Sequence, residues 1–266
     1  MVKIFGSLLK QFWIHPLARS IDVNDAHSIA IHRKIIQSKP LLKATYRRWY
    51  REILMAHKEI ENLTGDVIEI GSGAGFLDEL IPELIKTDVA PNPFASKIVN
   101  AMNLDFRDEQ LKAIYLIGVL HHISDPARFL AEAQRCLKPG GRLVIIDPNN
   151  SWTERALCKF LDHYEYFDDK INDWKNDSAN HMTNANLAVT WVIFTRDRAR
   201  FEAQFPQLHI RIIRHHTFLS YFLSGGMTYR SFLPSITTPL WEGFENILAP
   251  AMKILGTSMT IDIEKV

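Results

Sequence analysis

The sequence predicts a doubly wound α/β fold with a mostly parallel sheet, and three observations predict it. Short apolar runs such as residues 67–70 and 143–146 alternate with segments whose apolar residues recur at helical spacing. A turn with three glycines at alternate positions separates the first run from a helical pattern that begins at Phe76. A strand, a glycine turn and a helix form the first unit of such sheets, where the chain turns tightly beneath a ligand.

The first part of the chain, residues 1–62, is expected to form a helical cap. Apolar residues within 1–20 recur at helical spacing with lysines between them, which suits either packing on the domain or contact with a membrane surface. A better helix is predicted over 40–62, where Pro40 occupies the first turn. It directly precedes the first strand, so we expect it to lie across the mouth of the ligand cleft. Aromatic members of its apolar stripe are Tyr46, Trp49 and Tyr50.

Residues 63–150 are predicted to form the ligand-binding core. After the strand at 67–70, further strands are predicted at residues 85–89, 111–118 and 143–146. A helix is predicted between the last two, with Asp125 as its N-cap and Pro126 at its first position. The Pro-Gly-Gly sequence at 139–141 is expected to end this helix.

Residues 151–266 are predicted to complete the same domain and to carry an insertion. Helices are expected at 151–161, at 186–204 and at 241–255, the last of them broken at Pro250. The polar stretch from 163 to 186 is expected to be an inserted loop, and a strand is expected near 208–214. Residues 258–264 alternate between apolar and polar side chains as an edge strand does.

Composition excludes several classes of protein. Hydrophobic residues make up 47% and charged residues 23%, which is ordinary for a globular protein in the cytoplasm. Lysine plus arginine (31) nearly balances aspartate plus glutamate (30), so no overall charge favours nucleic acid. Cys136 and Cys158 have neither metal-ligand nor redox spacing, and Cys136 falls on the apolar face of a predicted helix. No apolar run approaches the roughly 18 residues of a membrane span.

The spacing of the glycines indicates which ligand the turn binds. A dinucleotide fingerprint has the pattern G-x-G-x-x-G, but here the third glycine, Gly75, comes one position early and Phe76 follows it. Glu69 precedes the turn, where a carboxylate would repel a pyrophosphate but pair with an amino group. An acid, Asp88, ends the second predicted strand near the spacing at which a carboxylate binds ribose hydroxyls.

Four ordered segments resemble the class I S-adenosylmethionine-dependent methyltransferases, in particular their small-molecule "type 11" branch. Residues 69–75 (E-I-G-S-G-A-G) are similar to motif I of that family. Residues 100–106 (N-A-M-N-L-D-F) resemble its D-A-x-x-L-P-F segment, with Asn100 and Asp105 as departures. Residues 118–126 and 136–143 resemble N-V-L-H-H-x-x-D-P and L-K-P-G-G-x-L. The similar region covers about a third of the chain, residues 65–148.

The resemblance implies a Rossmann-like sheet of seven strands in the order 3-2-1-4-5-7-6, with the last two strands antiparallel. It also implies a binding site for S-adenosylmethionine. Its methionine part is expected on Gly71, Ser72, Gly73 and Gly75, with Glu69 at the amino group. The ribose is expected on Asp88, and the adenine on Asn100, Ala101 and Met102. Gly118 is expected beneath the sulfonium.

Methyl transfer from a sulfonium is an in-line displacement, so an enzyme of this class mainly aligns the acceptor and excludes water. The abundance of aromatic residues outside the core segments suits a small-molecule acceptor that is possibly lipid-like. No cluster of His, Asp or Glu has metal-ligand spacing, so no metal is expected. The aromatic residues of 40–62 either face the sulfonium by cation–π contact or pack as an ordinary helix stripe.

A hydroxyl acceptor needs a general base, and four side chains are candidates: His121, His122, His163 and Glu165. His121 belongs to a histidine pair that follows the fourth strand, and at least one member of such a pair is expected to pack structurally. His163 and Glu165 lie in the inserted loop, where parts that bind the acceptor usually gather.

Two other functions remain open from the sequence. A non-catalytic protein that keeps the fold as a binding scaffold is suggested by Asn100 and Asp105, the two departures from the family pattern. A nicotinamide-dependent oxidoreductase would need a glycine where the chain has Phe76.

Overall fold

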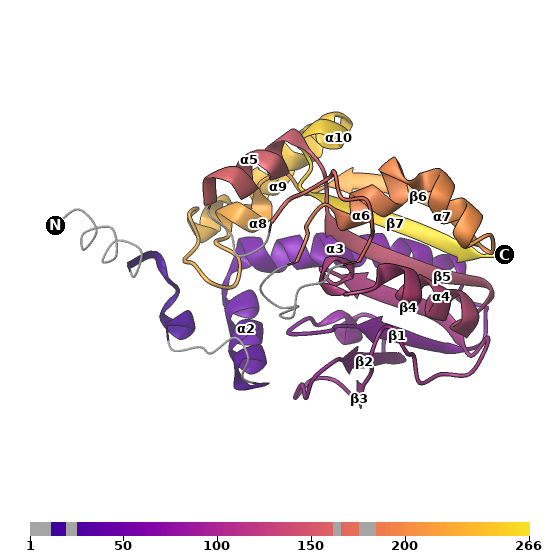
Figure 1. Cartoon of the computed structure of the whole chain (residues 1–266). Helices are drawn as coiled ribbons and strands as arrows, with labels where there is room; N and C mark the ends of the chain where they lie inside the picture. Colours follow the sequence, from indigo (N-terminus) through magenta and orange to yellow (C-terminus); the bar gives the residue numbers. More distant parts are fainter. Residues whose placement is uncertain (1–11, 20–25, 162–165, 176–184) are drawn as a thin grey trace.

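The computed structural model describes residues 12–19, 26–161, 166–175 and 185–266 (Figure 1). Its centre is a seven-stranded sheet in the order β3-β2-β1-β4-β5-β7-β6. Neighbouring strands run parallel from β3 to β5, and β7 is antiparallel to both β5 and β6. The predicted fold class and the strand order that the resemblance implied are therefore confirmed. The strands are β1 (Asp66–Ile70), β2 (Leu84–Asp88), β3 (Lys97–Ile98), β4 (Leu111–Ile117), β5 (Leu137–Pro148), β6 (Leu208–His216) and β7 (Ser258–Lys265).

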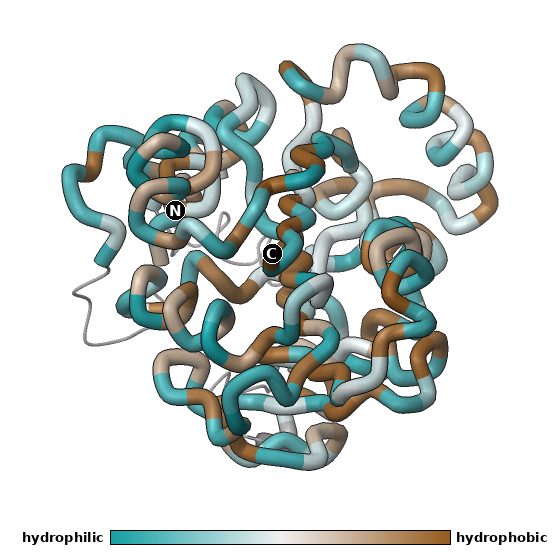
Figure 2. Tube along the Cα trace, turned by 90° about the vertical axis from the view of Figure 1, so that its right-hand side faces the viewer, coloured by the Kyte–Doolittle hydropathy of each residue, from teal (hydrophilic) through white to brown (hydrophobic). Residues whose placement is uncertain are grey.

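Alternate side chains of the central strands enter two separate apolar cores, one on each face of the sheet. Ile68 of β1 and Ile114 of β4 lie in one core with helices α4 (Pro126–Cys136) and α7 (Arg198–Gln204). Val67 and Tyr115 lie in the other core with α2 (Ala26–Ser38) and α3 (Pro40–Glu59). Figure 2 shows a column of hydrophobic segments through the middle of the molecule. Burial on both faces explains why these strands read as continuous apolar runs.

The remaining helices lie mainly at one edge of the sheet. Helix α5 (Trp152–Leu161) follows the carboxyl end of β5, and the segment from 217 to 257 joins the end of β6 to the start of β7. Because β6 runs parallel to β5, this segment lies at the edge where the parallel strands end (Figure 1). It contains α8 (Ser220–Leu223), α9 (Thr238–Ile247) and α10 (Met252–Leu255). A short α6 (Val189–Trp191) and a π-helical turn (Val192–Arg196) precede α7.

Three predicted elements are wrong in detail. The glycine turn leads to a single 3-10 turn, Leu77–Glu79, instead of an α-helix, because Pro82 disfavours helical backbone just before β2 begins. Strand β5 begins at Leu137, so the Pro-Gly-Gly sequence at 139–141 lies inside its first part. The preceding helix already ends at Cys136. Strand β7 is paired on both sides and buried, so β6 is the edge strand instead.

The described part of the N-terminal region docks on a loop of the C-terminal half. Ile14 forms a β-bridge with Tyr229, and the Trp13 ring lies 5.2 Å from that of Phe232. Lys39, just before α3, donates to the carbonyls of Gly226 and Tyr229 at 2.5 and 2.8 Å. Burial lowers the pKa of the Lys39 ammonium to about 8. Phe5 and the rest of the first eleven residues lie outside the described residues.

Among the helices in the described parts of the chain, none combines the length and the apolar character that a membrane crossing needs.

Candidate active site

The glycine turn after β1 is held in a conformation that only glycine adopts easily. Gly71 and Gly73 have positive φ angles of 64° and 45°. A Cβ at Gly71 would lie 2.6 Å from a methyl group of Val119, so the turn and the segment after β4 approach closely. Gly75 also has little room for a side chain, because a Cβ there would lie 3.1 Å from the Tyr50 hydroxyl. The glycines therefore allow close packing within the protein, and their contact with the methionine part stays a prediction.

Two cations stabilise the turn at a single oxygen. Arg33 of α2 and the buried Lys86 of β2 each donate to the Gly75 carbonyl at 2.6 Å. The Phe76 N–H donates to the Tyr50 hydroxyl at 2.7 Å. Tyr50 is fully buried, so it supports the turn from beneath. The sequence predicted that a helix would follow the turn. In the structure, these charge-assisted hydrogen bonds hold the turn instead.

Glu69 and Ser72 present buried polar atoms without a partner. Both residues are at most 5% exposed, and neither Glu69 Oε2 nor Ser72 Oγ has a hydrogen-bond partner within the protein. Burial raises the pKa of Glu69 to about 8, although the ammonium of Lys86 opposes this rise. Unsatisfied buried polar groups are costly, so their presence indicates a ligand that supplies donors. A carboxylate beside a hydroxyl fits the amino and carboxyl groups of an amino acid.

Asp88, at the end of β2, faces the same turn. Its carboxylate accepts from the Gly73 N–H at 3.2 Å and from the Asn92 side-chain amide at 2.8 Å. Asn92 also donates to the Gly73 carbonyl at 2.9 Å. Asn92 thereby fixes the acid against the glycine turn, and the predicted role of Asp88 in ribose binding stays a prediction.

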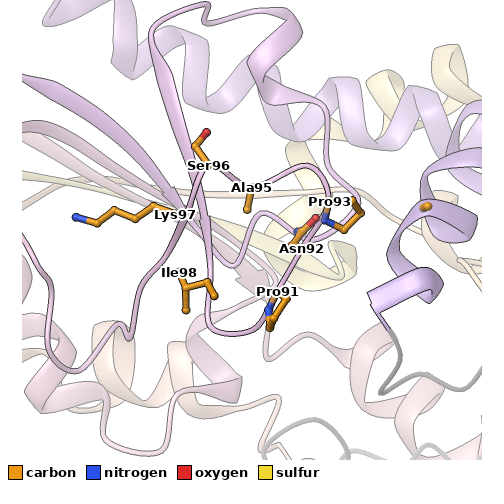
Figure 3. Close-up of a pocket in the computed structure, with 8 residues that line it drawn as sticks. Pro91, Asn92, Pro93, Ala95, Ser96, Lys97 and Ile98 are labelled. Atoms are coloured by element: carbon orange, nitrogen blue, oxygen red, sulfur yellow. The ribbon is translucent and has the colours of Figure 1, made fainter.

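A hollow of about 510 Å³ lies on the outer side of this network. Most of its lining comes from the loop 91–98, and Ala30 of α2 completes it; Figure 3 shows the Lys97 side chain extended away from Pro91 and Pro93. Asn92 belongs both to this lining and to the Asp88 network. None of the glycines of the turn lines the hollow, so it is separate from the glycine turn.

The segment predicted to bind adenine forms a tight turn. The Asn100 side-chain oxygen accepts from the Met102 N–H at 2.9 Å, and the Asn103 N–H donates to the Asn100 carbonyl. Asn100 is exposed and Ala101 half-buried. The Met102 N–H is therefore engaged within the chain, while the Asn100 amide and the Ala101 N–H remain the groups predicted for the adenine.

Gly118 ends β4 and leaves space above itself. It has a positive φ of 66°, and a Cβ built there would meet no atom within 4 Å. Its own N–H is satisfied by the Ile146 carbonyl at 2.8 Å. The absence of a side chain thus leaves open space at Gly118, and its place beneath the sulfonium stays a prediction.

His121 lies just beyond Gly118 and is held by a buried carboxylate. Its Nδ1 is 3.0 Å from Asp147 Oδ1, and its backbone N–H donates to Asp147 Oδ2 at 3.1 Å. The Thr190 hydroxyl donates to the same carboxylate. The Asp147 carboxylate therefore fixes the orientation of the His121 ring. The His122 ring stacks beside it at 4.1 Å.

Aromatic side chains of α3 and α8 form a wall beside the turn. Tyr46 packs on Phe76 at 6.0 Å and on Trp49 at 5.0 Å, and Trp49 packs on Tyr221 of α8 at 5.8 Å. Burial raises the pKa of Tyr46, and Tyr221 and Glu69 add to the rise. The wall therefore lies close to the carboxylate of Glu69.

The other two predicted bases, His163 and Glu165, lie outside the described residues. Within the described ranges no three His, Cys, Asp or Glu side chains come together as a metal site would require. Sequence reasoning missed four residues of this region: Arg33, Lys86, Asn92 and Asp147. Only Asn92 carries a local signal, the Pro-Asn-Pro turn that follows Asp88.

Comparisons with known proteins agree with this geometry. The family described as "Methyltransferase domain" matches residues 42–216, more than half of the chain. A ubiquinone biosynthesis O-methyltransferase of Bradyrhizobium sp. (strain ORS 278) is 30% identical over 38% of this chain and 47% of that protein. One of Rhodopseudomonas palustris (strain BisB18) is 27% identical over 50% of this chain and 62% of that protein. The chain thus spans about half to three fifths of these relatives.

A solved structure shares the fold. The S-adenosylmethionine-dependent methyltransferase of Archaeoglobus fulgidus is 14% identical, with a TM-score of 0.50, and the match covers 84% of this chain and 94% of that one. The four sequence motifs, the strand order and the family match agree. The chain belongs to the methyltransferase domain family, among the class I S-adenosylmethionine-dependent methyltransferases.

Proposed function

We propose that this protein transfers the methyl group of S-adenosylmethionine to a small, apolar acceptor. The observation that carries the proposal is the pair of unsatisfied buried groups, Glu69 Oε2 and Ser72 Oγ, beside the glycine turn. Glu69 binds the ammonium of the methionine part, and Ser72 with the turn binds its carboxylate. Asp88 binds the ribose hydroxyls. Asn100 and Ala101 contact the adenine.

The donor brings its own activation, because a sulfonium is a good leaving group. The protein's work is therefore to orient the acceptor and to exclude water. Gly118 leaves room for the sulfonium and the approaching acceptor, and Tyr46, Trp49 and Tyr221 supply an aromatic boundary. Aromatic faces attract a cation, so this wall also stabilises the positive charge of the donor.

For the acceptor we propose a ring hydroxyl of the phenol or hydroquinone class. Two of the relatives bear the names "Ubiquinone biosynthesis O-methyltransferase" and "2-methyl-6-phytyl-1,4-hydroquinone methyltransferase". The aromatic wall suits a planar apolar ring. His121, oriented by Asp147, takes the hydroxyl proton through Nε2 while the oxygen attacks the methyl carbon and the sulfur leaves with its electron pair.

The test is transfer of a labelled methyl group from S-adenosylmethionine to a panel of catechols and hydroquinones. We expect His121→Gln to lower kcat about 100-fold or more, with the S-adenosylhomocysteine affinity unchanged. We also expect the variant to lose the fall in rate at acidic pH, where a histidine base is protonated and can no longer accept the proton. His209→Gln, on the edge strand β6, is the matched control and should behave as wild type.

Two results would argue against the proposal. Binding of S-adenosylmethionine without transfer to any acceptor would favour the non-catalytic scaffold. Equal loss of kcat and of cofactor affinity in His121→Gln would mean that His121 is only structural.

A further inference from the structure

Helix α9 leaves large apolar side chains in solvent. Leu240 and Ile247 are 76% and 77% exposed, and Phe244 between them is 43% exposed. Their spacing of four and three residues places them on one face of the helix. Ile236, in the turn Ser235–Thr237 just before α9, is 86% exposed. We call these four residues the apolar ridge.

The opposite face of α9 is firmly attached, so the ridge points away from the core. Glu245 is buried, and its Oε1 accepts from the N–H groups of Phe218, Leu219 and Ser220 at 2.9 to 3.2 Å. Its other oxygen lies 2.7 Å from Arg48 of α3. Rotation of α9 to bury the ridge would break this network. The exposure of the ridge is therefore a fixed property of the fold.

A basic groove borders α9 on the side opposite the ridge. It has a volume of about 750 Å³ and lies between α3 and the start of α9. Lys43, Arg47 and Arg51 line its α3 wall at intervals of four residues, so their side chains follow one stripe of the helix. Thr238 and Glu242 line the α9 wall.

The three cations of the groove form no ion pair with any residue in the described part of the chain. Across the described residues, neither Lys43, Arg47 nor Arg51 forms an ion pair or a side-chain hydrogen bond. By contrast, Arg48, which lies between them in sequence, is paired with Glu245. Glu242 supplies one negative charge, so the groove keeps an excess of positive charge.

We propose that the ridge and the basic groove together form a docking surface for an anionic lipid bilayer. Apolar side chains on a helix enter the boundary between headgroups and acyl chains, while flanking cations lie at the level of the headgroup phosphates. The α3 cations lie behind the ridge, toward the headgroups of a bilayer that the ridge enters. A second copy of the chain fits less well, because a two-fold contact would bring two unneutralised basic stripes together.

The docking surface also lies near the proposed active site. Helix α9 lies at the edge where the parallel strands end (Figure 1). Trp241 of α9 donates to Ser220, the residue before Tyr221 of the aromatic wall. Docking here would bring the helical layer over the proposed active site to the bilayer. Binding of vesicles needs no methyl acceptor, so the inference does not depend on the proposed reaction.

The experiment is flotation of the full chain with phosphatidylcholine vesicles, with and without phosphatidylglycerol. We expect binding only to the vesicles that contain phosphatidylglycerol, and loss of that binding as salt rises. The triple variant Lys43→Gln, Arg47→Gln, Arg51→Gln should bind on the order of 100-fold more weakly, at roughly fivefold per cation. The double variant Leu240→Ser, Ile247→Ser should bind at least about tenfold more weakly.

Matched controls separate the surface from general charge and hydrophobicity. Arg107→Gln, Arg128→Gln, Lys138→Gln removes three cations outside the groove, and Val266→Ser removes an exposed apolar residue at the C-terminus. Both should bind vesicles as wild type does. Three results would each overturn the inference: no flotation of the wild type, equal binding to both kinds of vesicle, or equal weakening in the controls. A dimer that Leu240→Ser, Ile247→Ser dissociates, in a chain that does not float, would assign the ridge to a second copy.

Discussion

The protonation state of the buried Glu69 carboxyl group links the stability of the fold to binding of the donor. It is 2% exposed, one of its oxygens has no partner in the protein, and burial raises its pKa to about 8. In the ligand-free protein the group is therefore mostly protonated at pH 7. Because the folded state binds this proton more tightly than the unfolded chain, this group stabilises the fold below its unfolded pKa and loses that effect as pH rises through about 8.

Binding of the donor's ammonium reverses this preference, since a cation favours the ionised carboxyl group. We expect S-adenosylmethionine to release close to one proton on binding at about pH 6.5, where an α-amino group is still protonated. Calorimetry in buffers of different ionisation enthalpy measures that release. Glu69→Gln should abolish the dependence on buffer. A wild-type binding enthalpy that is the same in every buffer would show that Glu69 does not meet the ammonium.

At the residue scale, the glycines and Asp88 were predictable because local backbone geometry and strand ends place them. Gly71 and Gly118 have positive φ, and Asp88 lies opposite the Gly73 N–H. Asp147 was not predictable as the partner of His121, because 26 residues separate them and only the pairing of β4 with β5 brings them together. Whether Asn100, Ala101 and Met102 contact adenine stays a prediction.

Among the elements, the glycine turn depends on α2 more than the sequence suggested. Only a 3-10 turn follows it, so no helix terminus holds the Gly75 carbonyl in place. Arg33 of α2 and Lys86 of β2 do so instead. Sequence patterns cannot show this, because Arg33 precedes Gly75 by 42 residues and looks like any exposed helix arginine.

We expect Arg33→Ala to weaken binding of S-adenosylhomocysteine about tenfold, since a charge-assisted hydrogen bond contributes roughly 1.5–3 kcal/mol. Lys86 still donates to the same oxygen, so the fold should persist and thermal unfolding should change little. Lys34→Ala, on an exposed position of the same helix, is the control. Unchanged affinity in Arg33→Ala, measured by titration, would separate α2 from the binding of the donor.

At the scale of the whole molecule, a buried charge network joins the two halves of the chain. Arg142 of β5 is 2% exposed and bonds Asp262 of β7 at 3.2 Å. It also bonds Glu59 at the end of α3. Burial raises the pKa of Asp262, and the guanidinium of Arg142 opposes that rise. The network thus ties the C-terminal strand to the sheet and to the helix that precedes β1.

Removal of the cation should leave a buried acid without its partner. We expect Arg142→Met to lower the free energy of unfolding by about 3–5 kcal/mol at neutral pH. The loss should shrink toward acidic pH, where Asp262 is protonated and no longer needs a cation. Denaturant unfolding at two pH values measures both effects. Arg198→Met, at an exposed pair with Glu202, should cost no more than about 1 kcal/mol.

The overall architecture could be predicted from the sequence. Central strands are continuously apolar because both faces of the sheet are buried, and the covering helices are periodic because each buries one face. The position of β7 did not follow, since an inner antiparallel strand with polar residues such as Asp262 reads as an edge strand until Arg142 is seen to pair with it. The arrangement of the C-terminal helices at the site edge depends on contacts distant in sequence, such as Glu245 with residues 218–220.

Calorimetric titration with S-adenosylmethionine, S-adenosylhomocysteine and NAD(H) tests the proposed donor site most directly. Saturable one-to-one binding of the two sulfur ligands is expected, with no heat from NAD(H). Asp88→Ala should weaken both by tenfold or more, and Asp105→Ala, which removes an exposed acid paired with Lys97, should leave them unchanged. Binding of NAD(H), or wild-type affinity in Asp88→Ala, would contradict the assignment of this cleft to S-adenosylmethionine.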